Sequence, residues 1–184
     1  MVPDLGVLIA PEKSYQRLGA TEGTTGWTAV VQRSAVTALV LGTVISLIST
    51  GTATLVTVAS AMLYWSIVPL VQVAAAVLLV LSAPKRRVNV ARGVELMLVG
   101  HLPWTLFLLG VTVLLIKYPG VTLIMMAGAL IASVWRAVIV TALCRAVLGV
   151  DRRSAIARAI LHQSSLLAII FVYASWAVAL TARL

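Results

Sequence analysis

The sequence predicts an all-α integral membrane protein, a bundle of five transmembrane helices with a short N-terminal interfacial helix. Three observations support this fold class. The chain of 184 residues is 61% hydrophobic and 10% charged, with a mean hydropathy of +1.09, whereas soluble domains carry about 25% charged residues. Its apolar residues form continuous runs of roughly the 20 residues that a membrane-spanning helix needs. These runs lack the apolar–polar alternation of membrane β-barrel strands.

The same composition excludes several other classes of protein. A soluble enzyme or a disordered chain would need far more polar residues. Cys144 is the only cysteine, so the chain is no disulfide scaffold. The net charge of +9 would suggest nucleic acid in a soluble protein. Here the basic residues flank apolar runs, and we expect them to contact anionic lipid head groups instead, with no nucleic-acid partner.

The apolar runs place five spans at about residues 29–49, 53–81, 94–116, 121–147 and 155–182. Residues 1–27 are then a cytoplasmic N-terminal interfacial segment, and residues 28–184 form the transmembrane domain. Within the first segment we expect a short helix that begins near Pro11, a residue that suits the first helical turn. Gly149 and Asp151 are expected to end the fourth helix and to cap the fifth.

The basic residues predict the orientation of the chain, because cytoplasmic loops are enriched in Lys and Arg. Eleven of them lie before or near the start of the first span, between the second and third spans, or around the fourth-to-fifth connection: Lys13, Arg17, Arg33, Lys85, Arg86, Arg87, Arg92, Arg145, Arg152, Arg153 and Arg158. The other side has only Lys117 and Arg183. We therefore expect a cytoplasmic N-terminus and an outer C-terminus. The Ala-, Val- and Arg-rich composition is typical of a bacterial inner-membrane protein.

Small residues at four-residue spacing predict where the helices pack, because lipid-embedded helices associate through close approach. They are Ser34, Ala38, Gly42 and Ser46 in the first span, and Gly128 and Ala132 in the fourth. We expect both faces to be buried in the bundle. Pro69 and Pro103 should kink the second and third helices.

Five residues form the candidate intramembrane polar site: Arg136, Gln72, Glu95, His101 and His162. An ionisable residue in a span is a functional candidate by default. The simpler interpretation of Arg136 is that it reaches the cytoplasmic head groups or helix-end carbonyls. Glu95 could pair with Arg136 or Arg92, or complement the N-terminus of the third helix, which is the interpretation we favour.

The two histidines lie at similar depth and could be axial haem ligands, although hydrogen bonds to neighbouring hydroxyls are the commoner role. Cys144 and two histidines do not complete a metal site. No phosphate loop, paired carboxylates or nucleophile triad is present. We therefore expect no enzymatic activity, no cofactor and no metal.

The chain resembles the bacterial branch of the Yip family of five-span membrane proteins. The resemblance rests on the segment 8–18 with its proline-led PEKSYQRL, on Pro103 early in the third helix, and on Trp135 followed by the basic loop GVDRRSA at 149–155. It implies five helices, a cytoplasmic N-terminus and no catalysis. Eukaryotic members act in vesicle trafficking with small GTPases, a role that we do not transfer to a bacterial composition.

The expected function is a non-catalytic accessory or scaffold subunit of a larger membrane assembly, with other membrane subunits or further copies of the chain as partners. The alternative is a small transporter or channel subunit, in which Arg136, Gln72 and the two proline kinks line a path. A third possibility is a haem-binding electron-transfer subunit.

Overall fold

The structure is a computed structural model that describes residues 2–20, 26–83, 86–118 and 122–181. These residues form the helices α1 (Val2–Ile9), α2 (Pro11–Ala20), α3 (Trp27–Thr50), α4 (Leu55–Trp65), α5 (Ile67–Leu81), α6 (Val90–Val99), α7 (Leu102–Lys117), α8 (Thr122–Ala146) and α9 (Arg152–Thr181). Among the residues described there is no strand. By length and composition, α3, α4 with α5, α6 with α7, α8 and α9 are each able to cross a membrane. The predicted all-helical class is confirmed, and the five apolar helices indicate a multi-pass membrane protein.

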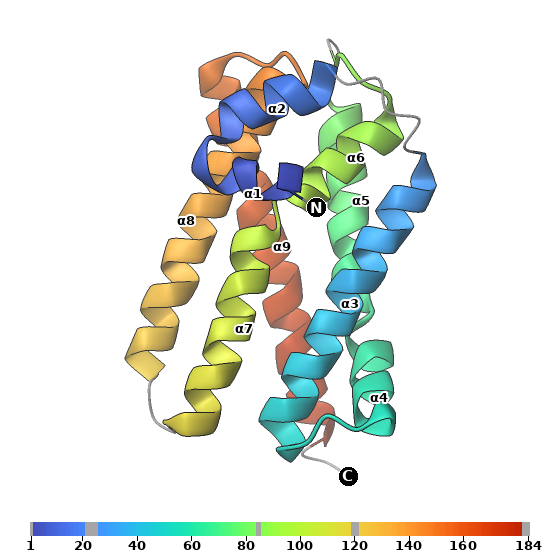
Figure 1. Cartoon of the computed structure of the whole chain (residues 1–184), viewed down its shortest axis with the longest axis vertical. Helices are drawn as coiled ribbons and strands as arrows, with labels where there is room; N and C mark the ends of the chain where they lie inside the picture. The colour runs from blue at the N-terminus through green and yellow to red at the C-terminus, as the bar shows by residue number, and fades with distance from the viewer. Residues whose placement is uncertain (1, 21–25, 84–85, 119–121, 182–184) are drawn as a thin grey trace.

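The long helices run along one axis, and the two short N-terminal helices lie at one end of the bundle (Figure 1). We call this end the basic end, because the connections from α5 to α6 and from α8 to α9 bring most of the arginines there. At the opposite end, α3 turns into α4 and α7 is followed by α8. Consecutive helices pack as neighbours: α3 with α4, α5 with α6, α7 with α8, and α8 with α9.

Two of the five spans are interrupted near their middle. The second breaks at Ser66, between α4 and α5, and the third breaks between Val99 and Leu102. A proline follows each break within a few residues, at Pro69 and Pro103. Proline has no backbone N–H and clashes with the carbonyl four residues earlier, which disrupts the helix at that point. The predicted kinks at the two prolines are thus observed as interruptions of the two helical spans.

The predicted small-residue faces lie against helices of the same chain. A Cβ atom on Gly42 would be 2.4 Å from Met62 Cγ and 3.0 Å from the Val58 carbonyl oxygen, both on α4. A Cβ atom on Gly128 would be 2.9 Å from a ring carbon of Phe107 on α7. Ser46 and Ala132 are buried as well, whereas Ser34 and Ala38 are half-buried. These glycines therefore allow helices of this chain to pack closely against one another.

We expect Gly42→Ala to lower the unfolding temperature, because the backbone of α4 leaves no space for a methyl group. Overpacking of this kind costs about 1–3 kcal/mol. Gly110→Ala is the matched control, since nothing lies within 4 Å of its added Cβ and Ala favours a helix by about 1 kcal/mol over Gly. Thermal unfolding in mild detergent measures both variants. Equal stability of the two would show that close approach does not limit α3–α4 packing.

The N-terminal segment is more deeply docked than the predicted interfacial helix. It forms two helices, with Pro11 as the first residue of α2. The Tyr15 side chain is fully buried, and its hydroxyl donates a hydrogen bond of 3.1 Å to the carbonyl of Leu96 on α6. Arg145 on α8 forms a 3.1 Å ion pair with Glu12. The amphipathic pattern predicted a surface helix because it cannot reveal a buried tyrosine contact 81 residues away.

The connection from α8 to α9 has the predicted caps. Gly149 has a φ of 66°, a left-handed conformation that glycine adopts without strain. The Asp151 carboxylate accepts a 3.0 Å hydrogen bond from the Ser154 backbone N–H and thereby caps α9. Hydrogen bonds from the Ser154 side chain and backbone lower the pKa of Asp151, so it stays ionised at the positive N-terminus of α9.

Candidate functional site

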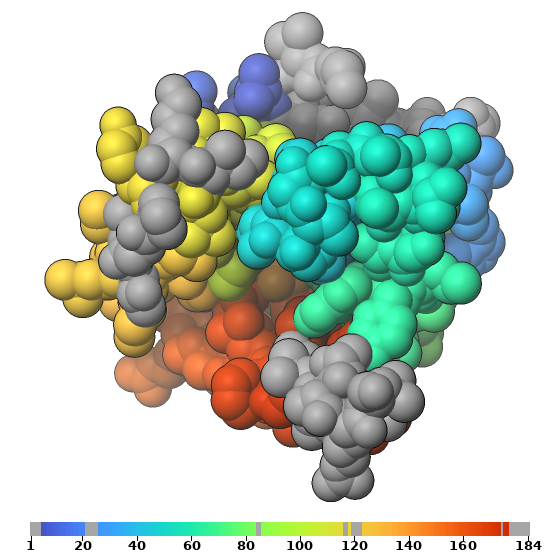
Figure 2. Space-filling view, turned by 90° about the horizontal axis from the view of Figure 1, so that it is seen from below, coloured from blue at the N-terminus to red at the C-terminus, as the bar shows by residue number. Residues whose placement is uncertain are grey.

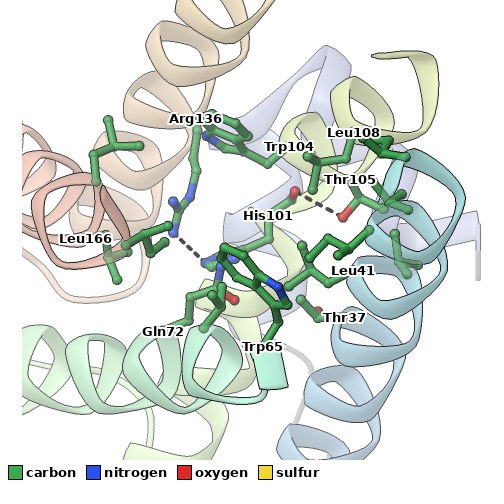
Figure 3. Close-up of a pocket in the computed structure, with 17 residues that line it drawn as sticks. Thr37, Leu41, Trp65, Gln72, His101, Trp104, Thr105, Leu108, Arg136 and Leu166 are labelled. Atoms are coloured by element: carbon green, nitrogen blue, oxygen red, sulfur yellow. Dashed lines mark hydrogen bonds between the residues drawn. The ribbon is translucent and has the colours of Figure 1, made fainter. Parts of the chain in front are cut away.

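A cavity of about 320 Å³ lies at the centre of the bundle. All five spans contribute to its walls, which are mainly Val, Leu, Ile and Trp side chains. Figure 3 shows how the labelled residues converge on it: Leu41 from α3, Trp65 and Gln72 from the second span, Trp104 and Leu108 from α7, and Leu166 from α9. Figure 2 shows the molecule from the opposite end, where the surface is hollowed between the cyan tip of α3, the yellow α7 and the red α9.

Two polar residues from different spans meet at this cavity. Arg136 Nη2 donates a 2.5 Å hydrogen bond to Nε2 of His101, which lies in the break between α6 and α7 (Figure 3). An acceptor Nε2 requires the neutral imidazole with its proton on Nδ1. The two side chains are only 4% and 5% exposed. The site is thus a buried guanidinium held by a neutral histidine.

The Arg136 side chain is buried within the bundle, bonded to His101, rather than exposed at the surface of α8. Helix α8 continues to Ala146, ten residues beyond Arg136, or about 15 Å at 1.5 Å per residue. The residue lies on the inner face of α8, one turn after the buried Ala132. Its side chain therefore points into the bundle, toward His101 in the break before α7.

Arg136 has no carboxylate partner among the acids whose side chains the structure describes. Glu95 pairs with Arg92 at 2.7 Å and with Arg33 at 3.7 Å. Glu12 pairs with Arg145, and Asp151 is exposed at the start of α9. Of the interpretations considered for Glu95, the structure therefore selects the pair with Arg92 and adds Arg33 from α3. The favoured interpretation, that Glu95 complements the helix N-terminus, is wrong, because α6 begins at Val90 and Glu95 lies beyond its first turn. The charge of Arg136 is not balanced by an ion pair within these residues.

Three buried polar atoms that lack a hydrogen-bond partner belong to residues lining the cavity: Arg136 Nε, Gln72 Oε1 and Trp104 Nε1. Buried polar groups in native proteins are nearly always satisfied by protein, water or ligand. Small-molecule sites are usually apolar cavities that contain a small number of polar groups. The arrangement can orient one polar group of a bound molecule.

The structure brings together three of the five predicted polar residues, Arg136, His101 and Gln72. His162 is buried nearby, within electrostatic range of both Arg136 and His101, but it does not line this cavity, and its Nε2 has no partner. Glu95 lies apart from this cavity, in its ion pairs with Arg92 and Arg33. Among the described residues, no group of three or more His, Cys, Asp or Glu side chains could hold a metal ion. Trp65 and Trp104 were not predicted as site residues, and the sequence pattern does not distinguish them from tryptophans at the membrane interface.

Comparison of the chain with protein-family models, with curated proteins and with solved structures found no match. The resemblance to the Yip family therefore stays a prediction.

Proposed function

We propose that the chain is a non-catalytic small transporter, or a subunit of one, that binds a largely apolar molecule with one polar end in the central cavity. The observation that carries this proposal is the buried Arg136, which lines an apolar cavity and has no acidic partner among the described residues. A buried charge costs several kcal/mol unless it is paired. Intramembrane charges accordingly tend to mark ligand or ion pathways.

The interrupted spans support a transport role. In many transporters the binding site lies near the bilayer midplane, beside helices that are broken there. Here Gln72 follows the break at Ser66, and His101 lies in the break between Val99 and Leu102. Both breaks are near the middle of their spans, and both spans line the cavity.

The basic end indicates how the proposed transporter is oriented in the membrane. With that end in the cytoplasm, as the positive-inside rule favours, the N-terminus is cytoplasmic, the C-terminus is outside, and the hollow seen in Figure 2 faces outward. The docked Tyr15 then lies on the cytoplasmic side of the cavity. A bacterial inner membrane, with anionic lipids at the basic end, is the location that we propose.

An accessory or scaffold role is the alternative. It was motivated by the absence of catalytic motifs, by the short loops, and by two small-residue faces that five helices alone could leave unused. Gly42 and Gly128 instead contact α4 and α7 of the same chain, so these faces no longer argue for further subunits. The absence of catalytic motifs and the short loops still favour this alternative.

The test is photolabelling of the purified protein in lipid nanodiscs with a diazirine-bearing C16 alcohol, followed by peptide mass spectrometry. We expect labels on cavity residues such as Val44 and Leu108. Leu41→Trp narrows the cavity and should remove those labels. Leu39→Trp is the matched control, because Leu39 is 51% exposed on the outer face of the same helix, and it should leave them unchanged. Labels confined to outer faces would overturn the proposal.

A further inference from the structure

We infer that the ligand of this cavity is a single-chain amphiphile with a carboxylate head, its head bound by Arg136 and its chain lying along the apolar walls. This inference rests on the proposed function and specifies the substrate class. Two independent properties of the site support it: the unbalanced charge at one position, and the chemistry of the remaining walls.

The charge at the site favours an anion. Arg136 Nη2 donates to a neutral histidine, which cannot compensate the positive charge. The buried Nε–H has no partner in the protein, and a carboxylate is the group whose two oxygens match two donors of one guanidinium. Helix α7 begins beside His101, and the positive end of its dipole adds to the field.

The remaining wall favours a hydrocarbon chain. Its two threonine hydroxyls already donate within their own helices, Thr37 to the Arg33 carbonyl at 3.0 Å and Thr105 to the His101 carbonyl at 3.4 Å. The other lining side chains of α3 and α9 are aliphatic. The volume of about 320 Å³ is at the lower end of the roughly 300–1,000 Å³ of small-molecule pockets. One chain therefore suits this cavity better than the two chains of a phospholipid.

Trp65 and Trp104 line the cavity and provide the readout, since bromine quenches tryptophan fluorescence on contact. Detergent-solubilised full-length protein is titrated with three probes: dibromostearic acid, the corresponding dibromo alcohol and a brominated phosphatidylglycerol. We expect the acid to quench at concentrations at least 10-fold lower than the alcohol, and Trp104→Phe to reduce the quenched fraction. Equal potency of acid and alcohol would overturn the carboxylate assignment and leave the proposed function intact. Quenching by none of the probes would overturn both.

Arg136→Gln tests the assigned head-group contact. We expect the affinity for the acid to fall about 10- to 100-fold, the usual effect of losing a charge-assisted hydrogen bond, while the alcohol is unaffected. Arg145→Gln is the control. It removes a charge from the same helix, where Arg145 forms an exposed ion pair with Glu12, and it should change neither the affinity for the acid nor that for the alcohol. If Arg136→Gln does not fold, the wild-type acid-to-alcohol ratio and Arg136→Lys, which should keep part of the preference, decide the question. Tighter binding of the phospholipid than of the acid would overturn the single-chain assignment.

Discussion

Glu95→Ala is expected to destabilise the protein by about 3–5 kcal/mol, the usual cost of removing one partner from a buried ion pair. Glu95 is 4% exposed, and its carboxylate accepts a 2.7 Å hydrogen bond from Arg92 and lies 3.7 Å from Arg33. Arg92 also donates to the Leu18 carbonyl at 2.9 Å. The variant thus weakens the junction of α2, α3 and α6 together. Denaturant or thermal unfolding in detergent measures the loss.

The matched control is Glu12→Ala, because the Glu12–Arg145 pair is exposed on both sides. Exposed pairs contribute about 0–1 kcal/mol, so this variant should unfold close to the wild type. Glu95→Gln keeps the shape and one acceptor oxygen and should lie between the two. A Glu95→Ala protein as stable as Glu12→Ala would show that Arg33 and Arg92 do not depend on this carboxylate.

Tyr15→Ala is expected to undock α2 and to cost about 3–5 kcal/mol, the range for truncating a buried large aromatic side chain. Tyr15 on α2 is fully buried, and its hydroxyl bonds to the Leu96 carbonyl on α6. Undocking would expose the backbone at Lys13 and Arg17. Tryptic cleavage at these two sites, timed against loss of the whole fold, measures the local effect.

Tyr15→Phe separates the hydroxyl from the ring, and we expect a loss of only about 1 kcal/mol, that of one hydrogen bond. Tyr118→Ala is the control, since Tyr118 is 61% exposed and its loss should change neither cleavage nor stability. If trypsin cuts Tyr15→Ala no faster than Tyr118→Ala, other contacts hold α2 in place and Tyr15 does not determine its docking.

Hydrophobic run length, proline positions and turn residues were enough to predict five long apolar helical segments, a distortion at each of the two prolines and the cap at Gly149. These features are local, because each depends on residues within about one or two helical turns. The small-residue faces were found for the same reason. Their spacing of four residues places Gly42 and Ser46 on one side of a helix whatever the neighbouring helices are.

The candidate site depended on information that local patterns do not contain. Arg136 and His101 are 35 residues apart, and their contact requires a particular rotation of α8 against the break that precedes α7. The sequence marked both residues as unusual, but it did not pair them. It also missed Arg33 as a partner of Glu95, because Arg33 approaches Glu95 only through the packing of α3 on α6.

Helix α2 is synthesised well before the residues of α6 and α8 that hold it in place. Glu12 is synthesised long before its partner Arg145, which follows it by 133 positions, a stretch that takes roughly 7–27 s at about 5–20 residues per second. Leu96, the acceptor for Tyr15, is also synthesised much later than Tyr15. Helices α1 and α2 therefore cannot complete their docking until α6 and α8, which follow them in the chain, have been synthesised.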